Sequence, residues 1–112
     1  MRKDRLASVL AREISNIVTQ DMKDPRLGFI TVTHVVVSAD LKKAIVYFSS
    51  LDNKTKSLGI LSKAKGYIRS SLAQRVRLRY IPDLTFEIDD SYEYGIKIDG
   101  LFEKISKNNK TE

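Results

Sequence analysis

The sequence predicts an α+β protein in which helices pack on one face of a three-stranded sheet. Two patterns predict this class: some segments place apolar residues three and four positions apart, as helices do, and others alternate apolar with polar residues, as strands do. The predicted order is helix, strand, strand, helix, kink, helix and strand, followed by a short C-terminal helix. The 112 residues are enough for one domain. We expect that domain over residues 1–105 and a flexible polar tail over 106–112.

The first predicted element is a long amphipathic helix over residues 4–22. We predict that Asp4 is its N-cap and that Pro25 ends it, because proline disfavours helical geometry at the residue before it. A loop over 24–28 follows. The apolar positions that define the buried face of the helix are Leu6, Val9, Leu10, Ile14, Ile17, Val18 and Met22.

Two strands follow this helix. Residues 29–37 and 44–48 are rich in β-branched and aromatic side chains, and the short polar stretch 38–41 lies between them. Two adjacent strands with such a short connection predict an antiparallel hairpin. Within the turn, we expect the Asp40 carboxylate to cap its own backbone.

The next stretch predicts two helices separated by a kink. Residues 54–64 form the first helix, with Leu58, Leu61 and Ala64 at helical spacing. We expect Gly66 to bend or break it. A second helix then runs from Tyr67, and its apolar residues are spaced four apart at Ile68, Leu72 and Val76.

After residue 76 the pattern changes to that of strands. Residues 77–80 alternate arginine with apolar side chains, and 84–89 alternate apolar with polar side chains. Pro82, between these two segments, indicates an edge position or a bulge. Residues 91–105 predict a closing helix, and its apolar residues Ile96, Leu101 and Ile105 cap the core.

The charges fall into two opposite blocks. Residues 54–82 carry eight lysines and arginines and no carboxylate, whereas residues 83–103 carry seven carboxylates and one lysine. A field polarised in this way attracts polyanions, RNA above all. The alternative to polyanion binding is that the basic block is a solvated helix with additional lysines.

Within the basic block we predict phosphate contacts for six residues and a kink element of three. The principal contacts are Lys63, Lys65, Arg69, Arg75, Arg77 and Arg79, and the secondary contacts near the N-terminus are Arg2, Lys3 and Arg5. The kink element is Ala64, Lys65 and Gly66. Two side chains have a second interpretation: Arg75 packs along the apolar line of its helix, and Tyr67 belongs to the core rather than stacking on a base.

The sequence contains few candidates for catalytic residues. The chain has one histidine, His34, inside a strand, and the adjacent Asp89 and Asp90 are more typical of a helix start than of a paired acid and base. There is no cysteine and no GxxxxGK[ST] loop, so we expect no catalysis, no metal and no cofactor.

We also expect no membrane segment. No apolar run reaches the roughly 18 residues that a transmembrane helix needs. Near the N-terminus, Asp4, Arg12 and Glu13 interrupt the apolar core that a signal peptide requires. We therefore expect a cytoplasmic protein.

A set of motifs in this order and spacing resembles the ribosome-binding factor A family of bacterial ribosome assembly factors. The resemblance covers roughly Arg5 to Ile105. Its motifs are Asp24-Pro25-Arg26-Leu27-Gly28, Ile30-Thr31-Val32 running to Val37-Ser38-Ala39-Asp40-Leu41, Ala44-Ile45-Val46-Tyr47, Gly66-Tyr67-Ile68-Arg69, and Leu78-Arg79-Tyr80-Ile81-Pro82-Asp83-Leu84-Thr85-Phe86.

The resemblance implies both a fold and a function. The fold is a single type II KH-like domain, in which Ala64-Lys65-Gly66 stands in for the phosphate-binding GxxG loop of RNA-binding KH domains. The implied function is non-enzymatic: binding to the immature small (30S) ribosomal subunit, late maturation of its 16S rRNA including the 5′ end, and adaptation to cold. The tail after Ile105 is short compared with the long charged extensions of some members. We expect a monomer, and assembly GTPases are candidate partners for release.

Two other functions remain open from the sequence. A general RNA-binding regulatory protein has the same charge but no preference for assembly intermediates. A protein-interaction module uses the acidic residues 83–103 against a basic partner and tolerates loss of the arginines.

Overall fold

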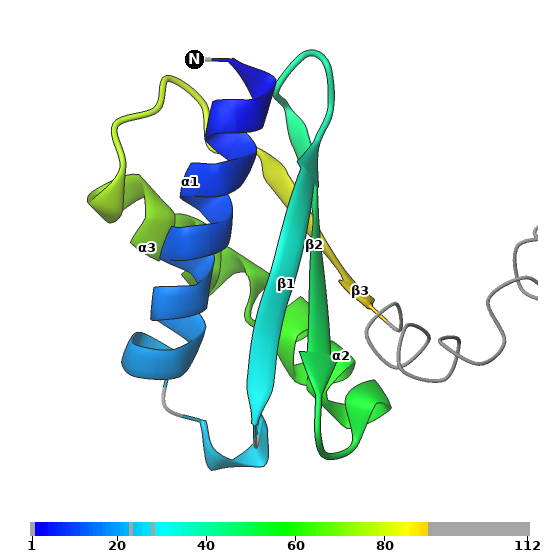
Figure 1. Cartoon of the computed structure of the whole chain (residues 1–112). Helices are drawn as coiled ribbons and strands as arrows, with labels where there is room; N and C mark the ends of the chain where they lie inside the picture. The colour runs from blue at the N-terminus through cyan, green and yellow to red at the C-terminus, as the bar shows by residue number, and fades with distance from the viewer. Residues whose placement is uncertain (1, 23, 28, 90–112) are drawn as a thin grey trace, which may run out of the picture.

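The computed structural model describes residues 2–22, 24–27 and 29–89, in which helices cover one face of a three-stranded sheet (Figure 1). The predicted closing helix 91–105 and the tail 106–112 lie outside these residues, so both stay predictions. The elements in chain order are α1 (Lys3–Asn16), the π-helix η1 (Ile17–Met22), the 3-10 turn η2 (Pro25–Leu27), β1 (Ile30–Val37), β2 (Lys43–Ser50), α2 (Lys54–Lys63), α3 (Lys65–Arg75) and β3 (Asp83–Ile88).

Helix α1 buries the predicted apolar face, but its N-cap differs from the prediction. Leu6, Leu10 and Ile14 are buried against the sheet. The N-cap is Arg2, which has extended geometry and makes no side-chain capping bond, so the prediction of Asp4 is wrong. The helix begins one residue earlier than predicted, and this places Asp4 in the first turn, where a carboxylate complements the positive end of the helix dipole.

Beyond Asn16 the helix widens into the π-helix η1, which the apolar spacing does not predict. Ile17 and Val18 of this segment remain buried. The Thr19 hydroxyl donates a 2.8 Å hydrogen bond to the Ser15 carbonyl oxygen four residues earlier. A π-helical turn holds more residues than an α-helical turn, so side chains after it point in directions that an α-helix would not give.

Strands β1 and β2 form the predicted antiparallel hairpin. The pairing runs from Ile30 opposite Ser50 to Val37 opposite Ala44, with a register shift between Val32 and His34.

The turn of this hairpin is held by Asp40, as predicted. The Asp40 carboxylate accepts hydrogen bonds from the Ser38 hydroxyl at 2.7 Å and from the Lys42 N–H at 3.0 Å. These two hydrogen bonds lower the pKa of Asp40.

Strand β3 pairs in parallel with β2, and the sheet order β1-β2-β3 makes it an edge strand. Pro82 precedes it directly, which confirms the predicted edge position. Leu84 and Phe86 are buried at alternate positions, as the sequence predicts. Parallel pairing requires a crossover, and α2 and α3 provide it.

The prediction of strand geometry for residues 77–80 is wrong. The whole segment 76–82 is a loop without strand pairing. Leu78 and Ile81 of this loop pack against the core, while Arg77 and Arg79 are exposed. The alternation in the sequence therefore reflects a loop that covers the core with every second or third side chain.

The core lies between the helices and the face of the sheet that they cover. Its strand residues occupy alternate positions, so the opposite face of the sheet carries exposed side chains such as Thr31, Thr85 and Glu87. The buried apolar residues are Leu6, Leu10, Ile14, Ile17, Val18, Leu27, Val35, Val37, Ala44, Val46, Phe48, Leu61, Ile68, Leu72, Leu84 and Phe86.

Candidate nucleic-acid interface

The kink between α2 and α3 lies at Ala64 rather than at Gly66. Ala64 has φ −88° and ψ 5°, and its N–H is shared between the carbonyl oxygens of Ile60 and Leu61. Gly66 lies in the first turn of α3, and a methyl group on its Cα would meet nothing within 4 Å. The expected break at Gly66 is therefore wrong by two residues, because helical geometry accommodates this glycine without strain.

A hollow of about 850 Å³ opens beside the kink. Its walls come from the start of α3, from β3 at the edge of the sheet and from the hairpin of β1 and β2. They include Lys65, Gly66, Arg69, Asp83, Thr85 and Glu87. The N-terminal end of α3 borders this hollow, and its N-cap Ala64 offers no side-chain hydrogen bond. Cations and the positive end of a helix thus border one hollow, together with the carboxylates of Asp83 and Glu87.

Three of the predicted phosphate contacts, Lys63, Arg77 and Arg79, are exposed. Over residues 2–22, 24–27 and 29–89, no carboxylate lies within ion-pair distance of them. Lys65 is half-buried at the kink. The charged groups of Lys63, Arg77 and Arg79 are therefore available to an anionic partner.

The N-terminal cations extend this surface. Figure 1 shows the loop 76–82, between α3 and β3, at the same end of the molecule as the start of α1. Arg77 and Arg79 belong to that loop, and the exposed Arg2, Lys3 and Arg5 surround the start of α1. The fold therefore brings two basic segments, more than seventy residues apart in sequence, to one end of the molecule.

Arg69 has a different environment. Its Nε donates to the Pro82 carbonyl oxygen at 3.0 Å and its Nη2 to the Ile81 carbonyl oxygen at 2.5 Å. The Asp83 carboxylate lies 3.7 Å from the same Nη2. Arg69 thereby ties the loop 76–82 to α3 at the point where β3 begins.

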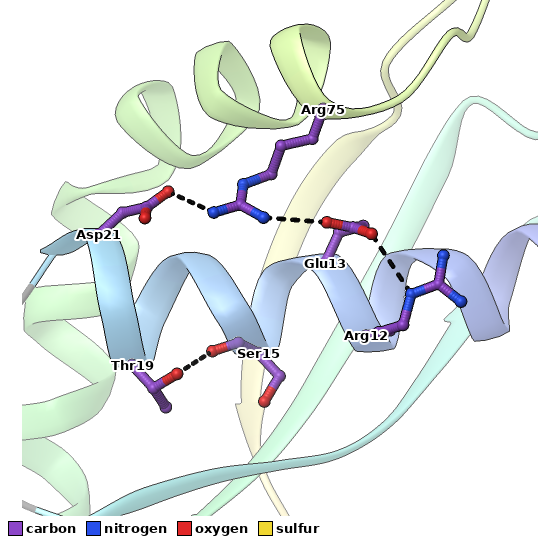
Figure 2. Close-up of polar contacts among 6 residues, drawn as sticks. All are labelled: Arg12, Glu13, Ser15, Thr19, Asp21 and Arg75. Carbon is purple, nitrogen blue, oxygen red and sulfur yellow. Dashed lines mark hydrogen bonds and ion pairs between the residues drawn. The ribbon is translucent and has the colours of Figure 1, made fainter.

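Arg75 is exposed, but its guanidinium group is paired with two carboxylates of the fold (Figure 2). Its Nη2 donates to Asp21 Oδ2 at 2.8 Å and its Nη1 to Glu13 Oε1 at 3.1 Å. These bonds, the one to Asp21 first, raise the pKa of Arg75. Figure 2 also shows Arg12 on the other side of Glu13, with Nε 3.3 Å from Oε2. Two carboxylates thus neutralise Arg75. The sequence predicted either a phosphate contact or packing along the helix for Arg75, and neither prediction included this pairing, because the carboxylates come from α1 and η1.

Tyr67 lies in the first turn of α3 and its side chain is 49 % exposed. Of the two interpretations that the sequence leaves open, the core placement is wrong. Ile68, the next residue, takes the buried position instead.

The model of the family described as ribosome-binding factor A matches residues 2–102. The chain belongs to the ribosome-binding factor A family.

Solved structures of this family share the fold. The crystal structure of ribosome-binding factor A from Thermus thermophilus has a TM-score of 0.73 and 33 % identity, and the match covers 79 % of this chain and 97 % of that chain. The solution NMR structure of a putative ribosome-binding factor A from Thermotoga maritima has a TM-score of 0.68 and 32 % identity, over 76 % of this chain and 84 % of that one. Since these structures are KH-like, the expected KH-like class is confirmed.

A third structure concerns a complex. A homology model of the Thermus thermophilus ribosome-binding factor A, fitted into a cryo-EM map of a 30S complex, has a TM-score of 0.67 and 32 % identity. The match covers 75 % of this chain and 91 % of that chain.

On the sheet, His34 and Asp89 lie within ion-pair distance of one another. The His34 ring stacks on Tyr47 with centroids 4.4 Å apart, and its Nδ1 lies 3.3 Å from Asp89 Oδ2. Asp89 is buried, accepts a hydrogen bond from Thr33, and donates its own N–H to the Phe48 carbonyl oxygen. Asp89 therefore extends the pairing of β3 with β2.

In the described part of the chain, no three histidines and carboxylates gather as metal ligands. No helix of that part is long and apolar enough to cross a membrane.

Proposed function

We propose that this member of the ribosome-binding factor A family is a non-enzymatic assembly factor that binds the small ribosomal subunit through its 16S rRNA. The observation that carries the proposal is the set of exposed, unneutralised cations in the described residues at the α2–α3 junction and the loop 76–82. The fitted 30S complex of the Thermus relative supports the choice of the small subunit.

Each group of cations has a role in this proposal. Lys63, Arg77 and Arg79 contact phosphates directly, since no carboxylate in residues 2–22, 24–27 and 29–89 competes for them. Lys65 lines the hollow beside the kink, and Arg69 fixes the loop that carries two of the contacts. Arg2, Lys3 and Arg5 extend the contact surface, and Arg75 contributes least because Glu13 and Asp21 already neutralise it.

Binding of this kind acts on maturation by shifting an equilibrium between rRNA conformations. A bound factor favours one conformation only by the difference between its affinities for the two. We propose that the protein holds an rRNA helix in an immature arrangement until late maturation of the 16S rRNA, including 5′-end processing, is complete, and that this assistance matters in the cold. The proposal also places a monomeric protein in the cytoplasm, with an assembly GTPase as a partner for release.

The test is cosedimentation of the full chain with small subunits, large subunits and assembled ribosomes over a salt series. Neutralisation of about five phosphates on single-stranded-like RNA predicts a slope of log affinity against log salt near −3.5. That slope corresponds to roughly a hundredfold loss between about 50 and 200 mM salt. We expect binding to small subunits only, with greater affinity for immature than for mature ones.

Two outcomes would contradict this proposal in different ways. Equal binding to small subunits, large subunits and an unrelated structured RNA would make the chain a general RNA-binding regulatory protein. Binding that is unaffected by charge reversal at Arg77 and Arg79 would indicate a protein-interaction module that uses the acidic residues 83–103, of which the structure describes Asp83, Glu87 and Asp89.

A further inference from the structure

One face of α3 carries an exposed aromatic ring with polar neighbours. Tyr67, Ser70, Ser71 and Gln74 are spaced three, four and seven residues apart, so they lie on one side of the helix. Buried Ile68 and Leu72 define the opposite, core-facing side. A half-exposed tyrosine on a helix otherwise lined with small polar residues provides a flat apolar surface for a ligand.

A pocket of about 470 Å³ lies along this face. It is lined by Asp21, Tyr67, Ser70, Ser71, Gln74 and Arg75, and its volume falls in the ordinary range for small-ligand sites. Asp21 comes from the π-helix η1, so the widened turn contributes one wall. π-Helical turns occur frequently at functional sites for this reason, because they redirect a side chain.

The lining chemistry suits an uncharged, hydrogen-bonding, planar group. Serine hydroxyls and a glutamine amide both donate and accept hydrogen bonds, as the edge of a nucleobase requires. Among the described residues that line the pocket, Arg75 is the cation, and Asp21 and Glu13 neutralise it, so the pocket disfavours a phosphate. Phosphates are favoured nearby instead, at Lys63 and Lys65 on either side of the kink that precedes Tyr67.

We propose that this pocket binds one unpaired RNA base, which stacks on the Tyr67 ring while its flanking phosphates lie toward the α2–α3 junction. The inference rests on the proposed function, and it specifies that the bound rRNA presents a single-stranded nucleotide to α3. Base–aromatic stacking requires a base that is not stacked in a duplex.

The first test measures affinity for a single-stranded RNA hexanucleotide and for an RNA duplex without unpaired bases. Tyr67→Ala should lower affinity for the hexanucleotide by about 5- to 160-fold, the range for loss of one stacked base. The salt slope should stay unchanged, because no phosphate contact is lost. Tyr67→Phe keeps the ring and should bind within about twofold of the wild type.

Tyr80 provides a matched control. It is 47 % exposed, close to the 49 % of Tyr67, but it lies in the loop 76–82 and does not line the pocket. Tyr80→Ala should therefore retain the affinity of the wild type for the hexanucleotide. Equal losses in Tyr67→Ala and Tyr80→Ala would overturn the assignment to the pocket, as would a loss in Tyr67→Phe equal to that in Tyr67→Ala.

A second test observes the stacking itself. The chain has no tryptophan, so Tyr67→Trp introduces a single indole at the pocket. We expect the hexanucleotide to quench its fluorescence and the duplex to leave it unchanged, whereas the indole of Tyr80→Trp should respond to neither. Quenching by a basic peptide but not by RNA would assign the pocket to a protein partner and overturn the proposal.

Failure of this inference and failure of the proposed function are distinguishable. If Tyr67→Ala binds small subunits and the hexanucleotide as the wild type does, stacking is excluded and the assembly-factor proposal stands. If the wild type itself does not bind small subunits, the proposed function fails whatever the tyrosine variants show. Circular dichroism of each variant verifies folding, which exposed Tyr67 should not affect.

Discussion

Two sets of cations that are mixed along the sequence have different environments in the fold. Arg69 donates to two carbonyl oxygens and Arg75 to two carboxylates, so both guanidinium groups serve the structure. Lys63, Arg77 and Arg79 are exposed, and no carboxylate among the described residues pairs with them. The formal charges are equal, but only the second set is available to a polyanion. A basic block in a sequence therefore overstates the charge that a partner meets.

Arg69→Ala should give the largest change in stability. Its removal leaves the carbonyl oxygens of Ile81 and Pro82 without their donors, which costs about 1–3 kcal/mol for hydrogen bonds to a charged group. Urea unfolding should show a lower midpoint for the variant. Arg69→Lys should recover only part of the loss, because an ammonium group cannot reproduce the planar fork. A midpoint equal to that of a Lys65→Ala control would contradict the structural role of Arg69.

The division of the cations into two sets also explains how much of the site was predictable. The sequence identifies the basic block and places the kink within two residues, because glycine and helical spacing are local signals. It does not reveal that Arg75 is neutralised, since Glu13 and Asp21 are 62 and 54 residues away and meet it only after α3 packs beside α1 and η1.

The fold itself was largely predictable, and its misses have physical reasons. The hairpin, the helical crossover and the edge strand follow from periodicity and proline placement. The π-helix η1 was missed because its apolar spacing fits a regular helix equally well over six residues. Residues 77–80 were predicted as a strand because a loop that packs Leu78 against the core and exposes Arg77 and Arg79 alternates in the same way.

Gly66→Ala tests the kink between α2 and α3. Its new methyl group meets nothing within 4 Å, so the substitution should stabilise the fold by about 0.5–1 kcal/mol through helix propensity. Gly59→Ala in α2 is the matched control, since that glycine is also helical with open space around it. We expect both variants to be stabilised, and only Gly66→Ala to weaken RNA binding if phosphates approach the kink. Destabilisation by Gly66→Ala alone would show that the kink requires glycine.

The smallest expected effect concerns the ion pair of Asp24 and Arg26, which belongs to neither set of cations. Asp24 accepts three hydrogen bonds from Arg26, from the side chain at 3.0 and 2.7 Å and from the backbone at 2.9 Å. These hydrogen bonds lower the pKa of Asp24 from 3.8 to about 2, and those from the Arg26 side chain have the largest effect.

Because that pKa is depressed, the contribution of Asp24 to stability is complete above pH 3.8 and is lost as the pH falls through about 2. An NMR titration of the Asp24 carboxyl carbon should show a midpoint near 2 in the wild type, returning toward 3.8 in Arg26→Ala. A midpoint near 3.8 in both proteins would mean that the pair does not form in solution.

The most direct test compares Arg79→Gln with Arg75→Gln in the small-subunit binding assay over a salt series. Each substitution removes one positive charge, so net charge is matched. Loss of one phosphate contact on single-stranded-like RNA should reduce the magnitude of the salt slope by about 0.7 for Arg79→Gln. Arg75→Gln should leave the slope unchanged, because Glu13 and Asp21 already neutralise that guanidinium. Equal reductions in both variants, or a larger one in Arg75→Gln, would contradict the division of the cations into held and available sets.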